Sequence, residues 1–368
     1  HPRPEGRVTG AEPGGWLEAV AGDATTSARL GEARRLQDML RVEASYARAL
    51  GAVGQVTPEI AEAAAKAIEA APIDTRQIAR EAAEDGMPVP SLSRQLRAAV
   101  PENLRDAVHK GLTSQDVMDT ALILTLRDIL LDFETRLDRV DAALARLDDA
   151  FGAAPLMART RMQAALPVTV ADRIALWRRP LADHRQRLAD LRPRLLRLQL
   201  GGPVGTRTSL HGHGDAIARH MAAALDLGNP DTAWHTDRSP LAELGGWLSM
   251  VTGSLGKMGH DIALMAQQGV DAVKLKGGGS SSAMAHKVNP VSAELLVTLA
   301  RYTAVQLPGL HLALDHEQER SGISWTLEWL ILPPMLIATG AALARAEALP
   351  AAIERMGEER GEKGTPGA

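Results

Sequence analysis

Residues 114–147 read SQDVMDTALILTLRDILLDFETRLDRVDAALARL, and this stretch decides the expected fold. Its large apolar residues recur every three or four positions: Leu122, Leu126, Ile129, Leu130, Phe133, Leu137, Val140, Leu144 and Leu147. That spacing places them on one face of a single helix, which would be roughly 50 Å long at 1.5 Å per residue. Because an apolar face of that length needs partners along all of it, the stretch predicts a bundle of long helices.

Further helical patterns lie on both sides of this stretch, and no convincing strand alternation accompanies them. We predict helices over 32–50, 57–71, 76–83, 168–200, 241–265, 291–314 and 324–355. The Gly- and Pro-rich residues 1 to about 30 are expected to be irregular. The predicted fold class is therefore all-α, with an N-terminal helical domain (1–112), a central long-helix bundle domain (113–345) and a short C-terminal tail (346–368).

The composition argues against several classes of protein. The 368 residues include no cysteine, which excludes disulfides, thiolate catalysis and Cys-ligated zinc. A net charge of -4 gives no support for binding nucleic acid or anionic membranes. We find no secretory signal, and the apolar stretch 329–343 is too short to span a membrane, so we expect a cytoplasmic protein. No metal-ligand spacing or phosphate-binding motif occurs, so neither a metal nor a cofactor is expected.

Residues 277–290, GGGSSSAMAHKVNP, carry the densest chemistry of the chain. Glycines let a loop move and let its backbone approach a ligand closely. Ser281 or Ser282 can transfer a proton, and Lys287 supplies a positive charge for an anion. Composition alone is also compatible with a flexible linker. The Met, His and Lys embedded in the loop, and the apolar helix that follows at once, favour a mobile catalytic loop instead.

This loop resembles the GSSxMPxKxNP loop of the fumarase/aspartase superfamily. The matching positions are Ser281, Ser282, Met284, Lys287, Asn289 and Pro290. Ser280 stands where the family has Gly, and Ala285 where it usually has Pro. The resemblance implies a serine that transfers the proton, a lysine that neutralises a carboxylate, and substrate contacts from Met284 and Asn289.

A second block, residues 109–116, reads HKGLTSQD. Thr113 and Ser114 before the long helix would cap it, with Asp116 favouring the helix dipole from the first turn. The same arrangement also makes an anion site, because hydroxyls and free helix N–H groups converge there. The block resembles the H-x-G-x-T-S-x-D segment of the superfamily, which binds a substrate carboxylate. The resemblance implies substrate binding by Thr113 and Ser114, and a catalytic role for His109, either by positioning or by lowering the effective pKa of the loop serine.

A third block, residues 158–163, reads ARTRMQ, where family members usually have T-H-x-Q. Arg161 therefore occupies the position of the family's histidine. A guanidinium cannot act as a general base at neutral pH, but it clamps carboxylates well. We expect Arg161 and Gln163 to bind the substrate, although Arg161 could also be an ordinary solvated residue.

Three further segments extend the resemblance over most of the chain. They are the Gly-rich turn at 201–206, Trp234-His235-Thr236 with Arg238, and residues 316–329. The last resembles the H-E-R-x-x-x-x-W-x-x-E-W segment of bacterial 3-carboxymuconate cycloisomerases, and the His-Asp pair of adenylosuccinate lyases is absent from residues 87–92. The resemblance implies roles for His235 in catalysis and for Arg238 and Arg320 in substrate binding. Taken alone, His235 could be structural and Arg238 an ion-pair partner.

The resemblance as a whole implies lactonisation of 3-carboxy-cis,cis-muconate in protocatechuate (beta-ketoadipate) catabolism. It also implies a homotetramer in which the Thr113 block, the Gly201/His235 region and the Ser281 loop of each active site come from different chains. Little sequence remains after the last core helix, so we expect a short form that largely lacks the family's C-terminal small domain. Two alternatives stay open: an adenylosuccinate lyase-like or other succinyl-lyase of the same superfamily, and an inactive structural homologue.

Overall fold

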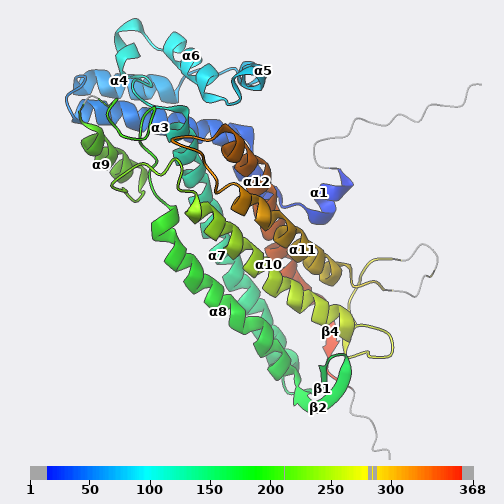
Figure 1. The fold of residues 1–368 in the computed structure, drawn as a ribbon. Coiled ribbons are helices and arrows are strands. Elements are labelled where there is room, and N and C mark those ends of the chain that lie inside the picture. Colours follow the sequence, from blue (N-terminus) through cyan, green and yellow to red (C-terminus); the bar gives the residue numbers. More distant parts are fainter. Residues whose placement is uncertain (1–14, 211, 281–283, 285–287, 359–368) are drawn as a thin grey trace, which may run out of the picture.

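The computed structural model describes residues 15–210, 212–280, 284 and 288–358. Five long helices dominate this part of the chain and run side by side along an elongated bundle (Figure 1). They are α7 (Ser114–Phe151), α8 (Val170–Leu195), α10 (Ser239–Met265), α11 (Val291–Leu312) and α12 (Gly322–Ala348). The all-α prediction is confirmed, and each of these helices was expected from its periodicity to within a few residues at most ends.

Shorter helices gather around the beginning of α7 (Figure 1). They are α3 (Glu32–Ala52), α4 (Pro58–Glu69), α5 (Thr75–Asp85), α6 (Val89–Ala99), the 3-10 helix η1 (Glu102–Ala107) and α9 (Gly214–Leu225). Of these, α6, η1 and α9 were not predicted. Two more unpredicted helices, α1 (Trp16–Ala21) and α2 (Ala24–Leu30), precede them, so the expectation of irregular chain was wrong for residues 16–30.

The apolar core has two parts that meet along α7. The larger part joins α8, α10, α11 and α12 to the α7 face that carries Phe133, Leu137 and Val140, all fully buried. The second part joins α3, α4 and α6 to Val117 and Leu124 of α7 and to Leu198–Leu225, which return from the bundle. The first turns of α7 are therefore fixed by both parts. The domain boundary at residue 112 stays a prediction.

Two small antiparallel sheets were not predicted. β1 (Pro155–Thr160) and β2 (Gln163–Thr169) form a hairpin between α7 and α8, and β3 (Val273–Leu275) pairs with β4 (Ile353–Met356), which follows the 3-10 helix η2 (Leu349–Ala352). The hairpin is exposed on both faces over most of its length, so its sequence carries no alternation of apolar and polar residues. Its two turn residues, Arg161 and Met162, have positive φ without the usual Asn-Gly signal.

The most apolar long segment runs from Gly322 to Ala352, which includes α12. By length and composition alone it could cross a membrane. In the structure, 56% of its apolar window is buried against the rest of the chain, and Met335, Leu336 and Leu343 are fully covered. The segment therefore packs as a core helix of the bundle.

Candidate active site

A dense group of polar residues lies where α7 begins. Asp116 is 1% exposed and accepts hydrogen bonds from the backbone N–H of Thr113 (3.2 Å), Gly201 (2.8 Å) and Gly202 (2.9 Å). Its Oδ1 also lies 2.8 Å from Nε2 of His235. Asp116 thus caps α7 and at the same time ties the 201–202 turn and His235 to it. We call Thr113, Gln115, Asp116, Gly201, Gly202 and His235 the Asp116 cluster.

His235 is held on several sides within this cluster. Gln115 donates from Nε2 to its backbone carbonyl at 2.9 Å. The ring is buried, and among the described residues its Nδ1 has no hydrogen-bond partner. A Cβ on Gly201 would lie 2.8 Å from Cε1 of the ring, which is too close, whereas Gly205 is favoured by its φ of +80°. A side chain at position 201 of the Gly-rich turn would therefore clash with this imidazole.

His109 lies at the same end of the bundle, on the turn that leads into α7. Its Nδ1 is 2.6 Å from Oε1 of Glu43, a fully buried carboxylate of α3. Burial of the ring alone would lower the pKa of His109, but the Glu43 carboxylate and, less strongly, Asp116 outweigh it, so the pKa is raised above its usual value. The ring remains partly exposed, with 16% of the side chain open to solvent. It is a cation-forming group at the edge of the Asp116 cluster.

Arg320 reaches this end of the bundle from the segment before α12. Its Nε donates to Oε1 of Gln115 at 3.1 Å and its Nη2 to the carbonyl of Pro203 at 3.1 Å. The side chain is half-buried, next to the Thr113-Ser114 start of α7. The structure therefore brings five predicted site residues to one place: Thr113, Ser114, His109, His235 and Arg320.

Arg238 has a different place from the predicted one. It is 1% exposed, and both edges of its guanidinium are filled by carboxylates: Asp119 at 2.6 and 3.0 Å, and Glu328 at 2.8 and 2.7 Å. Burial alone would raise the pKa of Asp119, but the Arg238 charge more than compensates and lowers it. Because all three of its guanidinium nitrogens donate to these two carboxylates, Arg238 links α7, α10 and α12. This is the ion-pair role that the sequence alone left open for Arg238.

Other predicted site residues lie far from the Asp116 cluster. Arg161 is in the exposed turn of the β1–β2 hairpin, which we call the hairpin tip (Thr160–Gln163), and Gln163 is also exposed. The hairpin is at the opposite end of α7, whose 38 residues span about 57 Å at 1.5 Å per residue (Figure 1). Within one chain, therefore, Arg161 and the Asp116 cluster cannot contact the same small molecule.

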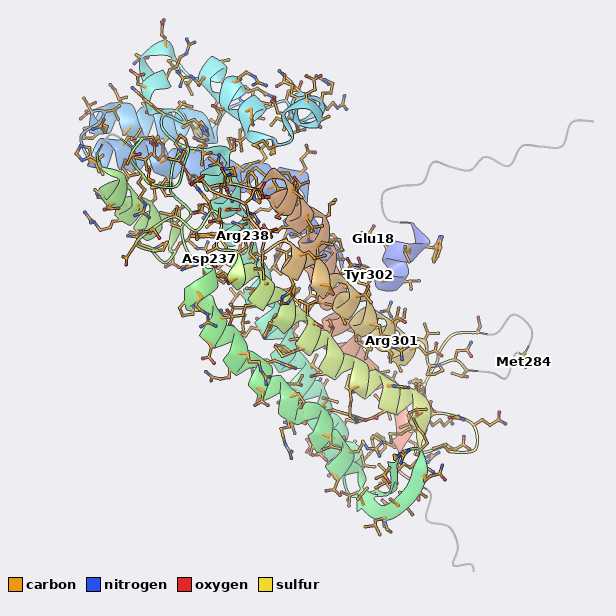
Figure 2. The ribbon with its side chains drawn as sticks, in the orientation of Figure 1. Glu18, Asp237, Arg238, Met284, Arg301 and Tyr302 are labelled. Atoms are coloured by element: carbon orange, nitrogen blue, oxygen red, sulfur yellow. The ribbon has the colours of Figure 1, made fainter. Side chains whose placement is uncertain are left out.

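The Ser281 loop joins α10 to α11. Figure 2 shows Met284 to one side of the bundle, clear of the helices and far from Arg238. Gly279 and Asn289 close the base of the loop with two backbone hydrogen bonds of 3.1 Å. Next to it lies a cavity of about 980 Å³ whose lining includes His260, Met284, Asn289 and Arg301. Ser281, Ser282 and Lys287 lie outside the described residues.

These positions correct one expectation about assembly. We predicted that the Thr113 block and the Gly201/His235 region would come from different chains. The structure instead joins them in one chain through Asp116, which contacts His235 at 2.8 Å and Gly201 at 2.8 Å. The reason is that the segment after α8 folds back onto the N-terminal helices and reaches the beginning of α7.

Sequence reasoning predicts a buried, paired carboxylate at Glu43, because this residue falls on the apolar stripe of residues 32–50, but it does not connect Glu43 with His109. It also missed Gln199, whose amide donates to Asp119 at 3.0 Å and accepts from the backbone N–H of Trp234 at 2.8 Å. For Glu43 a signal existed, because the residue falls on the apolar stripe of α3. No local pattern marks Gln199, whose partners are 35 and 80 residues away.

Comparison with known proteins adds the family. A model of the lyase family matches residues 19–305. The 3-carboxy-cis,cis-muconate cycloisomerase of Pseudomonas aeruginosa is 39% identical over 328 residues, which cover 87% of this chain and 71% of the relative. The nitrosuccinate lyase of Streptomyces davaonensis is 33% identical over 354 residues, or 91% of this chain and 74% of that protein.

Solved structures agree with these relatives. The chain superimposes on 3-carboxy-cis,cis-muconate lactonizing enzyme from Pseudomonas putida with a TM-score of 0.86 and 36% sequence identity. The match covers 92% of this chain and 77% of that one. The resemblance inferred from motifs thus extends over the whole bundle.

Proposed function

We infer that this chain, which belongs to the lyase family of the fumarase/aspartase superfamily, is a cycloisomerase that converts 3-carboxy-cis,cis-muconate to carboxymuconolactone. The observation that carries the proposal is the 39% identity to a cycloisomerase across 87% of the chain. The position of His109, Thr113, Ser114 and Arg320 around the start of α7 supports it, because these groups suit a polycarboxylate. The reaction would serve protocatechuate catabolism.

The proposed reaction needs no co-reactant. An oxygen of one substrate carboxylate attacks a diene carbon, forming the C–O bond of the lactone. The π electrons of that double bond move toward a neighbouring carboxylate, and one proton is delivered to carbon to form the new C–H bond. The enzyme must therefore neutralise a trianion, stabilise the growing enolate-like charge, and place one proton donor.

The Asp116 end would bind the substrate. Thr113 and Ser114 hydroxyls and the first N–H groups of α7 form an anion-binding helix start. Arg320 and a protonated His109 would add positive charge beside it. His235, anchored through Nε2 to Asp116, would hold the 201–202 turn against this site. These groups bind and orient, and none of them needs to activate a nucleophile.

The two distal segments would complete the site from other chains. We propose Ser281 as the proton donor, with Ser282 beside it, and Lys287 as the cation that stabilises the developing charge. Met284 and Asn289 would contact the substrate from the same loop. Arg161 and Gln163 at the hairpin tip would clamp a carboxylate. The hairpin tip, and Met284 of the loop, lie too far from the Asp116 cluster to act there in their own chain.

A homotetramer with shared active sites follows as part of the proposal. Large apolar side chains remain exposed on the outer faces of α11 and α12, including Val305 (73%), Leu312 (71%), Ile323 (82%) and Leu330 (67%). Contacts between copies would cover them. We also propose a cytoplasmic location, which the burial of the apolar segment in α12 supports.

One experiment tests the activity and a second tests the sharing of sites. Purified protein should convert 3-carboxy-cis,cis-muconate with loss of diene absorbance. Turnover of a succinyl or nitrosuccinate substrate instead would favour a succinyl-lyase, and no turnover of either by an intact oligomer would favour an inactive homologue. For sharing, Ser281→Ala and Asp116→Asn proteins should regain part of the activity when mixed after dissociation. A fully active monomer in sedimentation would rule the tetramer out.

A further inference from the structure

We propose that Glu43 is a positioning residue that fixes His109 in one orientation and in its cationic form, so that the Nε2–H edge of the ring binds a carboxylate of the substrate. The substrate's identity rests on the proposed function, but the state of His109 does not. Glu43 lies one helix away from the substrate-binding residues and would act only through the imidazole.

The contact itself carries the first step of the argument. Glu43 is fully buried in α3, and its Oε1 is 2.6 Å from Nδ1 of His109. Its Oε2 is buried as well and has no hydrogen-bond partner among the described residues. A buried carboxylate is costly unless a cation or several donors compensate it. The adjacent group able to supply a positive charge is the His109 ring, so the pair favours the imidazolium with Nδ1–H donating to Glu43.

The backbone at His109 is held in an unusual conformation, which fixes the position of the ring. Its φ is +55°, in the left-handed region that non-glycine residues seldom adopt. Neighbouring carbonyls are held from three sides: Tyr46 of α3 donates to Lys110, Arg97 of α6 donates to Val108 at 3.2 Å, and Ser209 donates to Gly111 at 3.1 Å. Strained residues persist when their surroundings over-determine them, and they cluster at functional sites.

The charges that act on His109 come from α3, α6 and α7. Glu43 of α3 and Asp116 of α7 favour the protonated ring, and Arg97 of α6 opposes it more weakly. The net effect, after burial has been outweighed, is a raised pKa. No hydrogen bond to Nε2 is formed within the described part of the chain, and 16% of the side chain is open to solvent. The Nε2–H edge is thus available to an anion.

The pH dependence follows with a definite sign. Because the cation binds the carboxylate, KM should be low below the pKa of His109 and should rise as pH increases through it. Neutralising Glu43 removes the main group that raises this pKa. The rise in KM should therefore begin at a lower pH in Glu43→Gln, while kcat at low pH changes little.

The direct test is NMR of the full-length protein labelled with 13C at the histidine Cε1 position. The His109 signal is assigned by its loss in His109→Gln. In the wild type it should titrate above the usual value of about 6.5, and in Glu43→Gln the pKa should fall by about 1 unit or more, as expected for losing an opposite charge in contact. Glu62→Gln, which neutralises an exposed carboxylate paired with Arg48, is the matched control and should leave the signal unchanged.

Two results would overturn the proposal. One is a wild-type His109 that titrates at or below 6.5, a result that does not require Glu43→Gln to fold. The other is a pKa that is the same in the wild type and in folded Glu43→Gln. Neither measurement uses the substrate. A shifted pKa without any lactonisation would leave the Glu43–His109 pair standing and reject the proposed function, whereas normal turnover with an unshifted pKa would do the reverse.

Discussion

Polar residues are buried and paired at one end of the bundle and exposed at the other. At the Asp116 cluster, carboxylate, imidazole and backbone donors are buried and paired within 3.2 Å of one another. At the hairpin tip, Arg161 and Gln163 are exposed on a two-stranded sheet that little else covers. The first arrangement is complete inside one chain. The second presents a guanidinium and an amide to solvent.

This difference suggests a division of labour. Burial and pairing fix the geometry of a site, because each partner leaves few alternative positions for the others. Exposure leaves a group free to bind something brought to it. We therefore read the Asp116 cluster as the rigid part of a site, and the hairpin tip and the Ser281 loop as parts that another copy of the chain receives. The following predictions test the two halves of this comparison.

The largest effect should come from removing the buried ion pairs of Arg238, at the same end of the bundle as the Asp116 cluster. Arg238→Met leaves the buried carboxylates of Asp119 and Glu328 without their shared cation. Removing one partner from a buried ion pair costs about 3–5 kcal/mol, so the free energy of unfolding should fall by about that much. The matched control is Arg194→Met, whose partner Glu243 is exposed and where an effect below about 1 kcal/mol is expected. Urea denaturation measures both, and equal losses would contradict the comparison.

The next largest effect should come from the distal half, at Ser281. Ser281→Ala should lower kcat by at least about 100-fold, since a general acid–base group is lost, while assembly and substrate binding persist. Ser282→Ala should cost less, because neighbouring side chains on a loop cannot both face the same carbon. Loss of diene absorbance gives both rates. Near-normal turnover in Ser281→Ala would move the proton donor to Ser282 or to another segment.

How far the sequence could predict these features depends on how local each one is. The apolar stripe of α7 gives the helix almost to the residue, because side chains three and four positions apart share a face whatever their surroundings. The Thr113 cap was equally readable, since capping is settled within four residues. The β1–β2 hairpin escaped prediction because it is exposed on both faces and its turn has no Gly or Asn.

The candidate site was predictable in its residues but not in their partners. His109, Thr113, Ser114, His235 and Arg320 do lie at one end of the bundle. A motif cannot say which donors are already used, so the resemblance assigned Arg238 to the substrate, while the ion-pair alternative, which its bonds to Asp119 and Glu328 support, stayed open. Likewise, the pairing of Glu43 with His109 spans 66 residues and depends on how α3 packs, which no local pattern records.

The smallest effect should come from the hairpin tip. It tests most directly whether an exposed residue there binds substrate in another chain. If Arg161 clamps a substrate carboxylate in another chain, it contributes binding that is about equal in the ground and transition states. Arg161→Ala should then raise KM about tenfold, which corresponds to losing ~1.4 kcal/mol, and change kcat much less. Arg159→Ala, an exposed arginine two residues away on β1, should leave both constants nearly unchanged. Steady-state kinetics of both variants separates the cases. A large fall in kcat with KM unchanged would give Arg161 a role in the chemical step, and no effect in either variant would leave the hairpin tip as plain solvated surface.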